Sequence, residues 1–143
     1  MGKVVFGLVL VILLLCISTV SIASSLTDNI FGTYKTVSES EWEVSLELKK
    51  NGNAIIEDSS WLAGNKERTI TSHSGTWHNN GTKVYIKYNG ITEVLIYSES
   101  LSLSELGESG GIPGLKSRAK SSDKGVIGTV SLWSTEALKS RLK

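Results

Sequence analysis

Strict alternation of apolar and polar residues is the feature that most limits what this chain can fold into. Between Glu41 and Lys49 every second residue is large and apolar, and the residues between them are charged or serine. Successive side chains of a β-strand point to opposite faces, so a period of two predicts a half-buried antiparallel strand. Lys83–Tyr88 repeats the pattern. We therefore expect two-faced strands rather than amphipathic helices.

Short turn sequences separate these strands. Asn51-Gly52 predicts a type I′ hairpin turn, because both residues tolerate positive φ. Asn79-Asn80-Gly81 and Asn89-Gly90 predict the next two turns. The expected strands are Ile30–Val37, Glu41–Lys49, Ala54–Asp58, Lys66–Trp77, Lys83–Tyr88, Ile91–Ser98 and Val126–Trp133. This series predicts an all-β fold, a small antiparallel meander barrel with a β-sandwich as the alternative; we favour the barrel because closure removes exposed edges.

Two segments depart from the alternating pattern. Lys66–Trp77 has only Ile70 and Trp77 as large apolar residues, and their parity places them on opposite faces. We expect an edge strand there; the alternatives are a bulge at Gly75 or a strand that lines a polar interior. The cluster from Gly110 to Gly114, which contains the only proline, is expected to break regular structure.

Helical signals are weak. Ser102 and Glu105 have the spacing of a capping box, but Gly107 would end such a helix almost at once. Ser134 could cap a short C-terminal helix over residues 134–142, which would need docking to be stable.

The N-terminus has the layout of a secretory signal peptide. Lys3 precedes a nearly unbroken apolar run from Val4 to Ile17, and Ser21-Ile22-Ala23 places small residues before a cleavage point. We expect a helical signal peptide at 1–23 and one mature domain at 24–143, periplasmic or extracellular. Membrane contact would be through the signal segment alone, and the alternative is an uncleaved anchor through residues 4–23.

Cleavage would leave a nearly neutral domain without a thiol. Cys16 is the only cysteine, so the mature chain would lack disulfides, cysteine metal ligands and cysteine nucleophiles. The formal net charge of +1 includes Lys3, and a neutral domain gives no reason to expect a nucleic-acid partner.

No residue pattern points to catalysis, a metal or a cofactor. His73 and His78 are the only histidines, and their parity places them on opposite faces of a strand. Serine is abundant, but no G-x-S-x-G nucleophile elbow is present. We therefore expect no enzymatic activity and no cofactor. A small hydrolase is the third hypothesis, and it requires a buried cluster of perturbed titratable groups.

Aromatic residues are the best candidates for ligand or partner contacts. Trp61 and Leu62 lie in a segment that reads as a loop, where an exposed pair would suit a lid or a partner contact. Trp42, Trp77 and Tyr88 are expected to line the interior or a binding face. The loop over residues 106–115 is a second candidate for a mobile mouth.

Several short motifs resemble those of a known family. Gly32-Thr33-Tyr34, the hairpin from Leu46 to Gly52, Gly75-Thr76-Trp77 and the Asn80-Gly81 turn resemble lipocalin-like (calycin-type) small barrels of bacterial envelopes. The resemblance covers Gly32–Tyr88 and implies a barrel with an apolar cavity. The chain has no CxxC motif and no cysteine placed for lipidation, so neither lipid anchoring nor cysteine-based copper sensing carries over.

These observations favour a binding protein. The leading hypothesis is an exported, non-enzymatic small barrel that binds an apolar or amphipathic small molecule. The alternative is a protein-binding module such as a periplasmic inhibitor, an immunity protein or an envelope-complex subunit.

Overall fold

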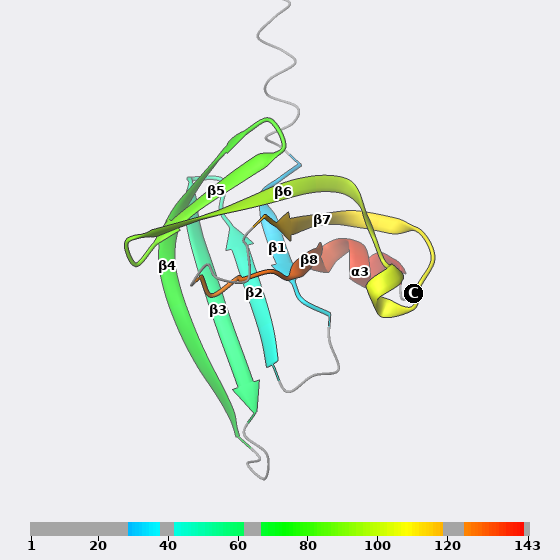
Figure 1. The fold of residues 1–143 in the computed structure, drawn as a ribbon, viewed down its shortest axis with the longest axis horizontal. Coiled ribbons are helices and arrows are strands. Elements are labelled where there is room, and N and C mark those ends of the chain that lie inside the picture. The colour runs from blue at the N-terminus through cyan, green and yellow to red at the C-terminus, as the bar shows by residue number, and fades with distance from the viewer. Residues whose placement is uncertain (1–28, 38–41, 62–66, 119–124, 142–143) are drawn as a thin grey trace, which may run out of the picture. The chain divides into compact units, whose positions relative to one another are not determined.

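A closed β-barrel is the main feature of the fold. The computed structural model describes residues 29–37, 42–61, 67–118 and 125–141. The chain divides into two units, Met1–Ile30 and Phe31–Lys143, and the predicted signal peptide at 1–23 lies outside the described residues. In the second unit, eight antiparallel strands form a closed barrel in which each strand pairs with the next and β8 returns to β1 (Figure 1). The predicted meander barrel is confirmed, and the closed topology excludes the sandwich alternative.

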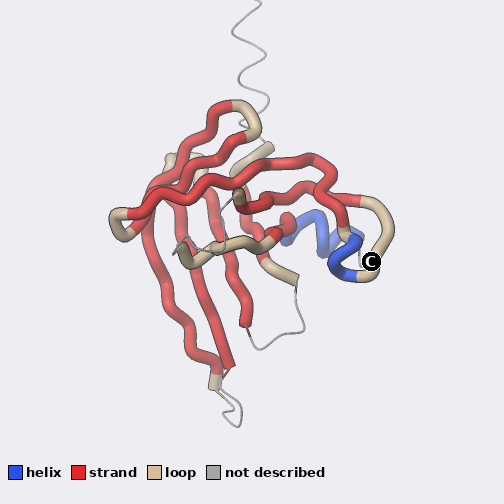
Figure 2. Tube along the Cα trace, in the orientation of Figure 1, coloured by secondary structure: helices blue, strands red, loops and turns tan. Residues whose placement is uncertain are grey.

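The strands are β1 (Gly32–Lys35), β2 (Trp42–Leu48), β3 (Asn53–Trp61), β4 (Arg68–Asn80), β5 (Lys83–Tyr88), β6 (Ile91–Ser102), β7 (Gly111–Ser117) and β8 (Ser131–Ser134). The helical elements are the 3₁₀ helix η1 (Ser104–Leu106) and the α-helix α3 (Thr135–Arg141), drawn in blue in Figure 2. No helix within the described ranges is long and apolar enough to cross a membrane.

The conformation of the hairpin turns depends on glycine and asparagine residues that adopt positive φ. Asn89 and Gly90 have φ of 46° and 77°, as a type I′ turn requires. The type I′ prediction for Asn51-Gly52 is wrong, because Gly52 alone has positive φ there, 83°. Lys49 and Asn53 are hydrogen-bonded across that turn, with 2.9 Å from Lys49 N to Asn53 O. Three residues, 50–52, therefore lie between this hydrogen-bonded pair, one more than a type I′ turn holds.

Strand β4 corrects the edge-strand prediction. It pairs with β3 over Arg68–Thr76 and with β5 over Gly75–Asn80, without a register shift in either pairing. The edge strand and the bulge at Gly75 are therefore both wrong. A Cβ at Gly75 would lie 2.9 Å from the Cβ of Tyr88, so glycine is needed there for close strand approach. On the face that Gly75 shares, His73 and Trp77 are half-buried and Thr69 and Thr71 are exposed, so β4 contributes no fully buried side chain and the polar-interior alternative stays a prediction.

The prediction that the glycine–proline cluster at residues 110–114 breaks regular structure is wrong, because most of this cluster lies inside strand β7. Pro113 cannot donate to a ladder, but the pairing of β6 with β7 is interrupted opposite it, between Ser98 and Leu101. A Cβ at Gly111 would lie 2.5 Å from Ser100 Oγ, and one at Gly114 would lie 2.7 Å from Leu132 O. The glycines thus serve close packing of strands, and residues 111–115 of the expected loop are part of β7.

The predicted last strand and the two helical signals are partly right. The strand begins at Ser131 rather than Val126. Instead of a capping-box helix, η1 is a single 3₁₀ turn without a side-chain cap, ended by Gly107 at φ 72°. Helix α3 lies within the predicted range, and Ser134 Oγ accepts a hydrogen bond from Ala137 N at 3.4 Å, as a cap should.

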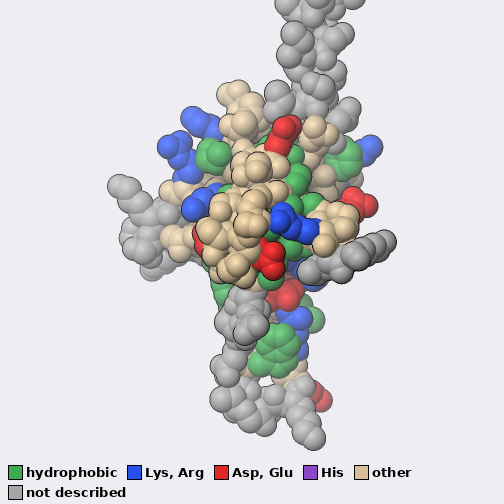
Figure 3. Space-filling view, turned by 90° about the vertical axis from the view of Figure 1, so that its right-hand side faces the viewer, with side chains coloured by type: hydrophobic (Ala, Val, Ile, Leu, Met, Phe, Trp, Pro, Cys, Tyr) green, Lys and Arg blue, Asp and Glu red, His purple; other side chains and the backbone are tan. Residues whose placement is uncertain are grey.

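A second apolar cluster lies outside the barrel wall. Leu103, Ile112 and Trp133 are buried together, and η1 and α3 cover them. The covering side chains are Leu101, Leu106, Ala137 and Leu138. This contact supplies the docking that a seven-residue helix needs. In Figure 3, basic and acidic side chains on the face that includes this region are interspersed rather than gathered by sign.

Candidate functional site

The centre of the barrel is filled by apolar side chains. The strands contribute inward-facing residues whose side chains have no exposed surface: Val44, Leu46, Ile56, Val84, Ile86, Leu95, Leu115 and Leu132. A void large enough for a water molecule would expose the side chains of its walls. No such void therefore adjoins these residues. A ligand can enter the deep interior only if part of the chain moves.

The barrel wall is weakest between β1 and β8. The two strands share only two residue pairs in the described structure, Tyr34 with Ser134 and Lys35 with Trp133. Beyond Lys35, Thr36 bonds to β2 instead: Thr36 N donates to Val44 O at 2.9 Å, and Val44 N donates to Thr36 Oγ1 at 3.0 Å. We call this junction the β1–β8 seam.

A pocket of about 360 Å³ lies at the seam. This volume falls within the range of about 300–1,000 Å³ common for small-molecule sites. The lining combines two indoles, two valines, three hydroxyl side chains and one carboxylate: Thr36, Val37, Trp42, Glu105, Thr129, Val130, Ser131 and Trp133. The pocket is therefore amphipathic. We call it the seam pocket.

The polar groups of the seam pocket are partly engaged. Glu105 Oε1 accepts a hydrogen bond from Ser131 Oγ at 3.3 Å and lies 3.8 Å from Lys116 Nζ. Trp133 donates its indole N–H to Ser102 O at 3.2 Å, which fixes the ring against the outer cluster. The Trp133 ring is thus held rigidly, while Glu105, about half exposed, is accessible to a ligand.

The chain that leads into the seam pocket also closes the barrel end. Residues 125–130, here called the strap, run from Gly125 to the start of β8. Ile127 in the strap has no exposed surface. Glu93, on the inner face of β6 and only 7% exposed, accepts hydrogen bonds from Ile127 N and Gly128 N, both at 3.2 Å. A buried carboxylate therefore fastens the strap by its backbone.

Tyr88 forms the other half of this fastening. Its hydroxyl donates to Glu93 Oε1 and accepts a hydrogen bond from Val126 N at 2.7 Å. Burial, and then the hydrogen bond to Glu93, raise the pKa of Tyr88 far above the ordinary value of 10.0. The phenol therefore keeps its proton in the folded protein. A Cβ on Gly125 would overlap the Glu93 carboxylate, so the strap approaches as closely as glycine permits.

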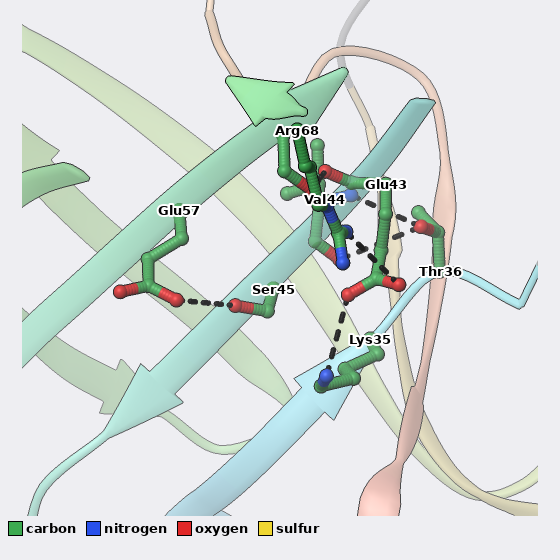
Figure 4. A network of polar contacts seen from close by, with 8 residues as sticks. Lys35, Thr36, Glu43, Val44, Ser45, Glu57 and Arg68 are labelled. Atoms are coloured by element: carbon green, nitrogen blue, oxygen red, sulfur yellow. Dashed lines mark hydrogen bonds and ion pairs between the residues drawn. The ribbon is translucent and has the colours of Figure 1, made fainter. Parts of the chain in front are cut away.

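A separate charged network joins β1, β2 and β4 (Figure 4). Glu43 pairs with Lys35 at 3.3 Å and with Arg68 at 3.2 Å. The Arg68 guanidinium lies 4.5 Å from the Trp61 ring centre and also donates to Ser59 Oγ. These contacts link the neighbouring strands, although exposed ion pairs contribute at most about 1 kcal/mol each.

The five predicted contact residues do not form one site. Trp42 lines the seam pocket, and Tyr88 fastens the strap. Trp61 is the last residue of β3 rather than a loop residue, and it is 38% exposed. Trp77 is half-buried and donates its indole N–H to Lys49 O at 2.8 Å, beside the first hairpin turn. Leu62 lies outside the described residues.

The geometry offers no metal centre among the described residues, where no three histidine, cysteine or acidic side chains gather. The two histidines are separated as parity predicted. His78 stacks on Tyr85 with ring centres 4.9 Å apart, and His73 Nδ1 lies 2.9 Å from Asn89 Nδ2.

Sequence reasoning missed Glu93, Ile127 and Glu105 as site residues. Glu93 stands at an inward position of a strand with Leu95 and Tyr97. That break in the apolar face was the one signal that could have identified it. Glu105 and Ile127 gave no such signal, because their positions depend on how loops fold back.

The comparisons with known proteins identify no relative. No protein-family model, curated protein or solved structure matches the chain.

Proposed function

We propose that the protein is an exported, non-enzymatic, lipocalin-like (calycin-type) barrel that binds a small amphipathic molecule at the seam pocket. Support for export is the N-terminal leader pattern, and support for the family is the closed eight-stranded meander. The seam pocket carries the proposal, because two indole rings and a carboxylate line a space of ligand size.

The pocket suits an amphipathic ligand better than a purely apolar one. The half-buried Trp42 offers apolar contact, which stabilises a ligand roughly in proportion to the buried area, whereas Trp133 is only 2% exposed and contributes less. Glu105 and the hydroxyl groups around it would lose water on contact with an apolar ligand. A molecule with a polar group on one side and an apolar body on the other can contact the indole rings and the polar side chains of the pocket at once.

Tryptophan fluorescence titration with a panel of decyl amphiphiles tests this function, and native mass spectrometry of the purified exported protein provides the stoichiometry. We expect one bound molecule and at least a fivefold loss of affinity in Trp42→Phe. Trp61→Phe is the matched control, because Trp61 lies outside the pocket. Equal effects of the two variants, or no bound mass, would contradict the proposal.

Binding of a protein partner is the second candidate function, favoured by two exposed apolar side chains, Trp61 on β3 and Ile70 on β4. Ile70 is 60% exposed and Trp61 38% exposed, and the pairing of β3 with β4 places both on the same face. Affinity capture from envelope or culture fluid tests it. We expect a stoichiometric partner that is lost on Trp61→Ala and kept on Trp42→Phe; the reverse pattern would point back to the seam pocket.

A further inference from the structure

The fastening of the strap is the most elaborate polar contact inside the barrel. Glu93 accepts hydrogen bonds from two backbone amides of the strap and from the Tyr88 hydroxyl. The same hydroxyl accepts a hydrogen bond from a third amide of the strap. Within the described ranges, no lysine or arginine forms an ion pair with Glu93. The carboxylate thus has hydrogen-bond donors but no cation.

A full carboxylate is a costly way to hold a loop. Burying a charge requires strong compensating contacts, and neutral amides compensate it less than a cationic N–H group does. Glutamine could not make the same contacts, because Oε1 and Oε2 of Glu93 each accept an amide hydrogen bond and a glutamine NH2 group would face one of these donors. A protonated amine would supply the positive charge that these neutral donors lack.

The strap itself has the form of such a ligand. Ile127 places a branched aliphatic side chain in the barrel, and two consecutive N–H groups, those of Ile127 and Gly128, meet the carboxylate. The strap thus presents hydrogen-bond donors and an aliphatic side chain together, as an aliphatic amine would. The strap continues through Thr129 and Val130 into the lining of the seam pocket, so a molecule bound there lies beside it.

We propose that Glu93 and Tyr88 form a ligand-binding position that the strap occupies in this structure, and that the displacing ligand is an aliphatic amine with a protonated head. The inference rests on the proposed function, since it specifies which amphiphile binds. A fatty acid is excluded, because its carboxylate would face Glu93 in a buried site. A neutral alcohol lacks the charge that would compete with the strap.

Three ligands with the same chain, decylamine, decanol and decanoate, test the proposal with the purified exported protein below their micelle concentrations. We expect decylamine to bind at least tenfold more tightly than decanol, and decanoate not to bind. Decylamine should also speed hydrogen exchange of the Val126, Ile127 and Gly128 amides at least tenfold. In Glu93→Gln, the preference for decylamine over decanol should fall at least tenfold. In the control Glu99→Gln, an exposed position on the same strand, the preference should not change.

The outcomes separate this inference from the proposed function. If decanol binds as well as decylamine and the strap amides stay protected, amphiphile binding stands and the displacement proposal is overturned. If none of the three ligands binds, both are overturned. Should Glu93→Gln not fold, the head-group preference and amide exchange of the unmodified protein still decide the question.

Discussion

Replacement of Ile127 tests whether the strap closes the barrel as described. The side chain has no exposed surface and lies in a segment that has little regular structure of its own. Removing a fully buried isoleucine to alanine costs about 2–5 kcal/mol, part from lost transfer free energy and part from the cavity that remains. We expect Ile127→Ala to lower the free energy of unfolding by about 3 kcal/mol. For a domain of this size, that corresponds to a fall of roughly 10 °C in Tm.

Ile70→Ala provides a control of identical chemistry. Ile70 is 60% exposed on the outer face of β4, so its truncation should change the free energy of unfolding by no more than about 0.5 kcal/mol. Urea unfolding, followed by circular dichroism and tryptophan fluorescence, measures both variants. The slope m should not change, because neither substitution alters the surface that unfolding exposes.

Two results would contradict the reasoning in different ways. Equal midpoints for the two variants would mean that Ile127 is not buried in solution. A loss near 1 kcal/mol with a freely exchanging Gly128 amide would mean that the strap detaches locally, so that the loss is capped by its docking free energy. Only the first result refutes the closed barrel end.

Three further predictions concern ionisation, packing and export. Burial raises the pKa values of Tyr34 and Tyr88 above 10.0, so their contribution to stability is complete below pH 10 and is lost as the pH rises above it. Absorbance at 295 nm should show that these phenols ionise only when the protein unfolds. Reversible ionisation of both phenols before unfolding would contradict their burial. Gly75→Ala should lower stability by at least about 2 kcal/mol in urea unfolding, because its Cβ would meet β5, whereas Gly81→Ala, with open space around it, should lose only about 1 kcal/mol from its positive φ. N-terminal sequencing of exported material should begin at Ser24; a start at Met1 in a membrane fraction would indicate an uncleaved anchor.

Alternation made most of the barrel predictable. In β2 and β5 the period of two reports directly which side chains face the core, and Val44 and Ile86 are fully buried as that pattern requires. The hairpins were predictable for a similar reason, since Asn-Gly pairs mark turns through their own backbone freedom. These signals are local, so each can be read without knowledge of the rest of the fold.

The sequence-based predictions were wrong where the conformation of a residue depends on contacts with residues far away in the chain. The glycines of β7 reflect the closeness of β6 and β8, not a break in the chain, and Pro113 is accommodated only because the pairing with β6 is interrupted opposite it. Likewise, the sequence around Ile127 resembles a strand, yet Glu93 and Tyr88 hold it as a strap. Nothing within residues 125–130 encodes those partners, so the candidate site could not be assembled from local pattern alone.

Stability and affinity should change in opposite directions if the strap and a ligand compete for Glu93. The closed strap stabilises the fold, and its population lowers apparent affinity by the fraction of molecules in which the site is free. A substitution such as Ile127→Ala weakens the closed state but leaves the strap-displaced, ligand-bound state unchanged. The free energy lost from folding should therefore equal the free energy gained in decylamine binding, about tenfold in Kd for each 1.4 kcal/mol, until the strap is mostly open. Ile70→Ala should change neither quantity. A variant that loses stability and affinity together would show that the strap builds the binding site instead of occupying it.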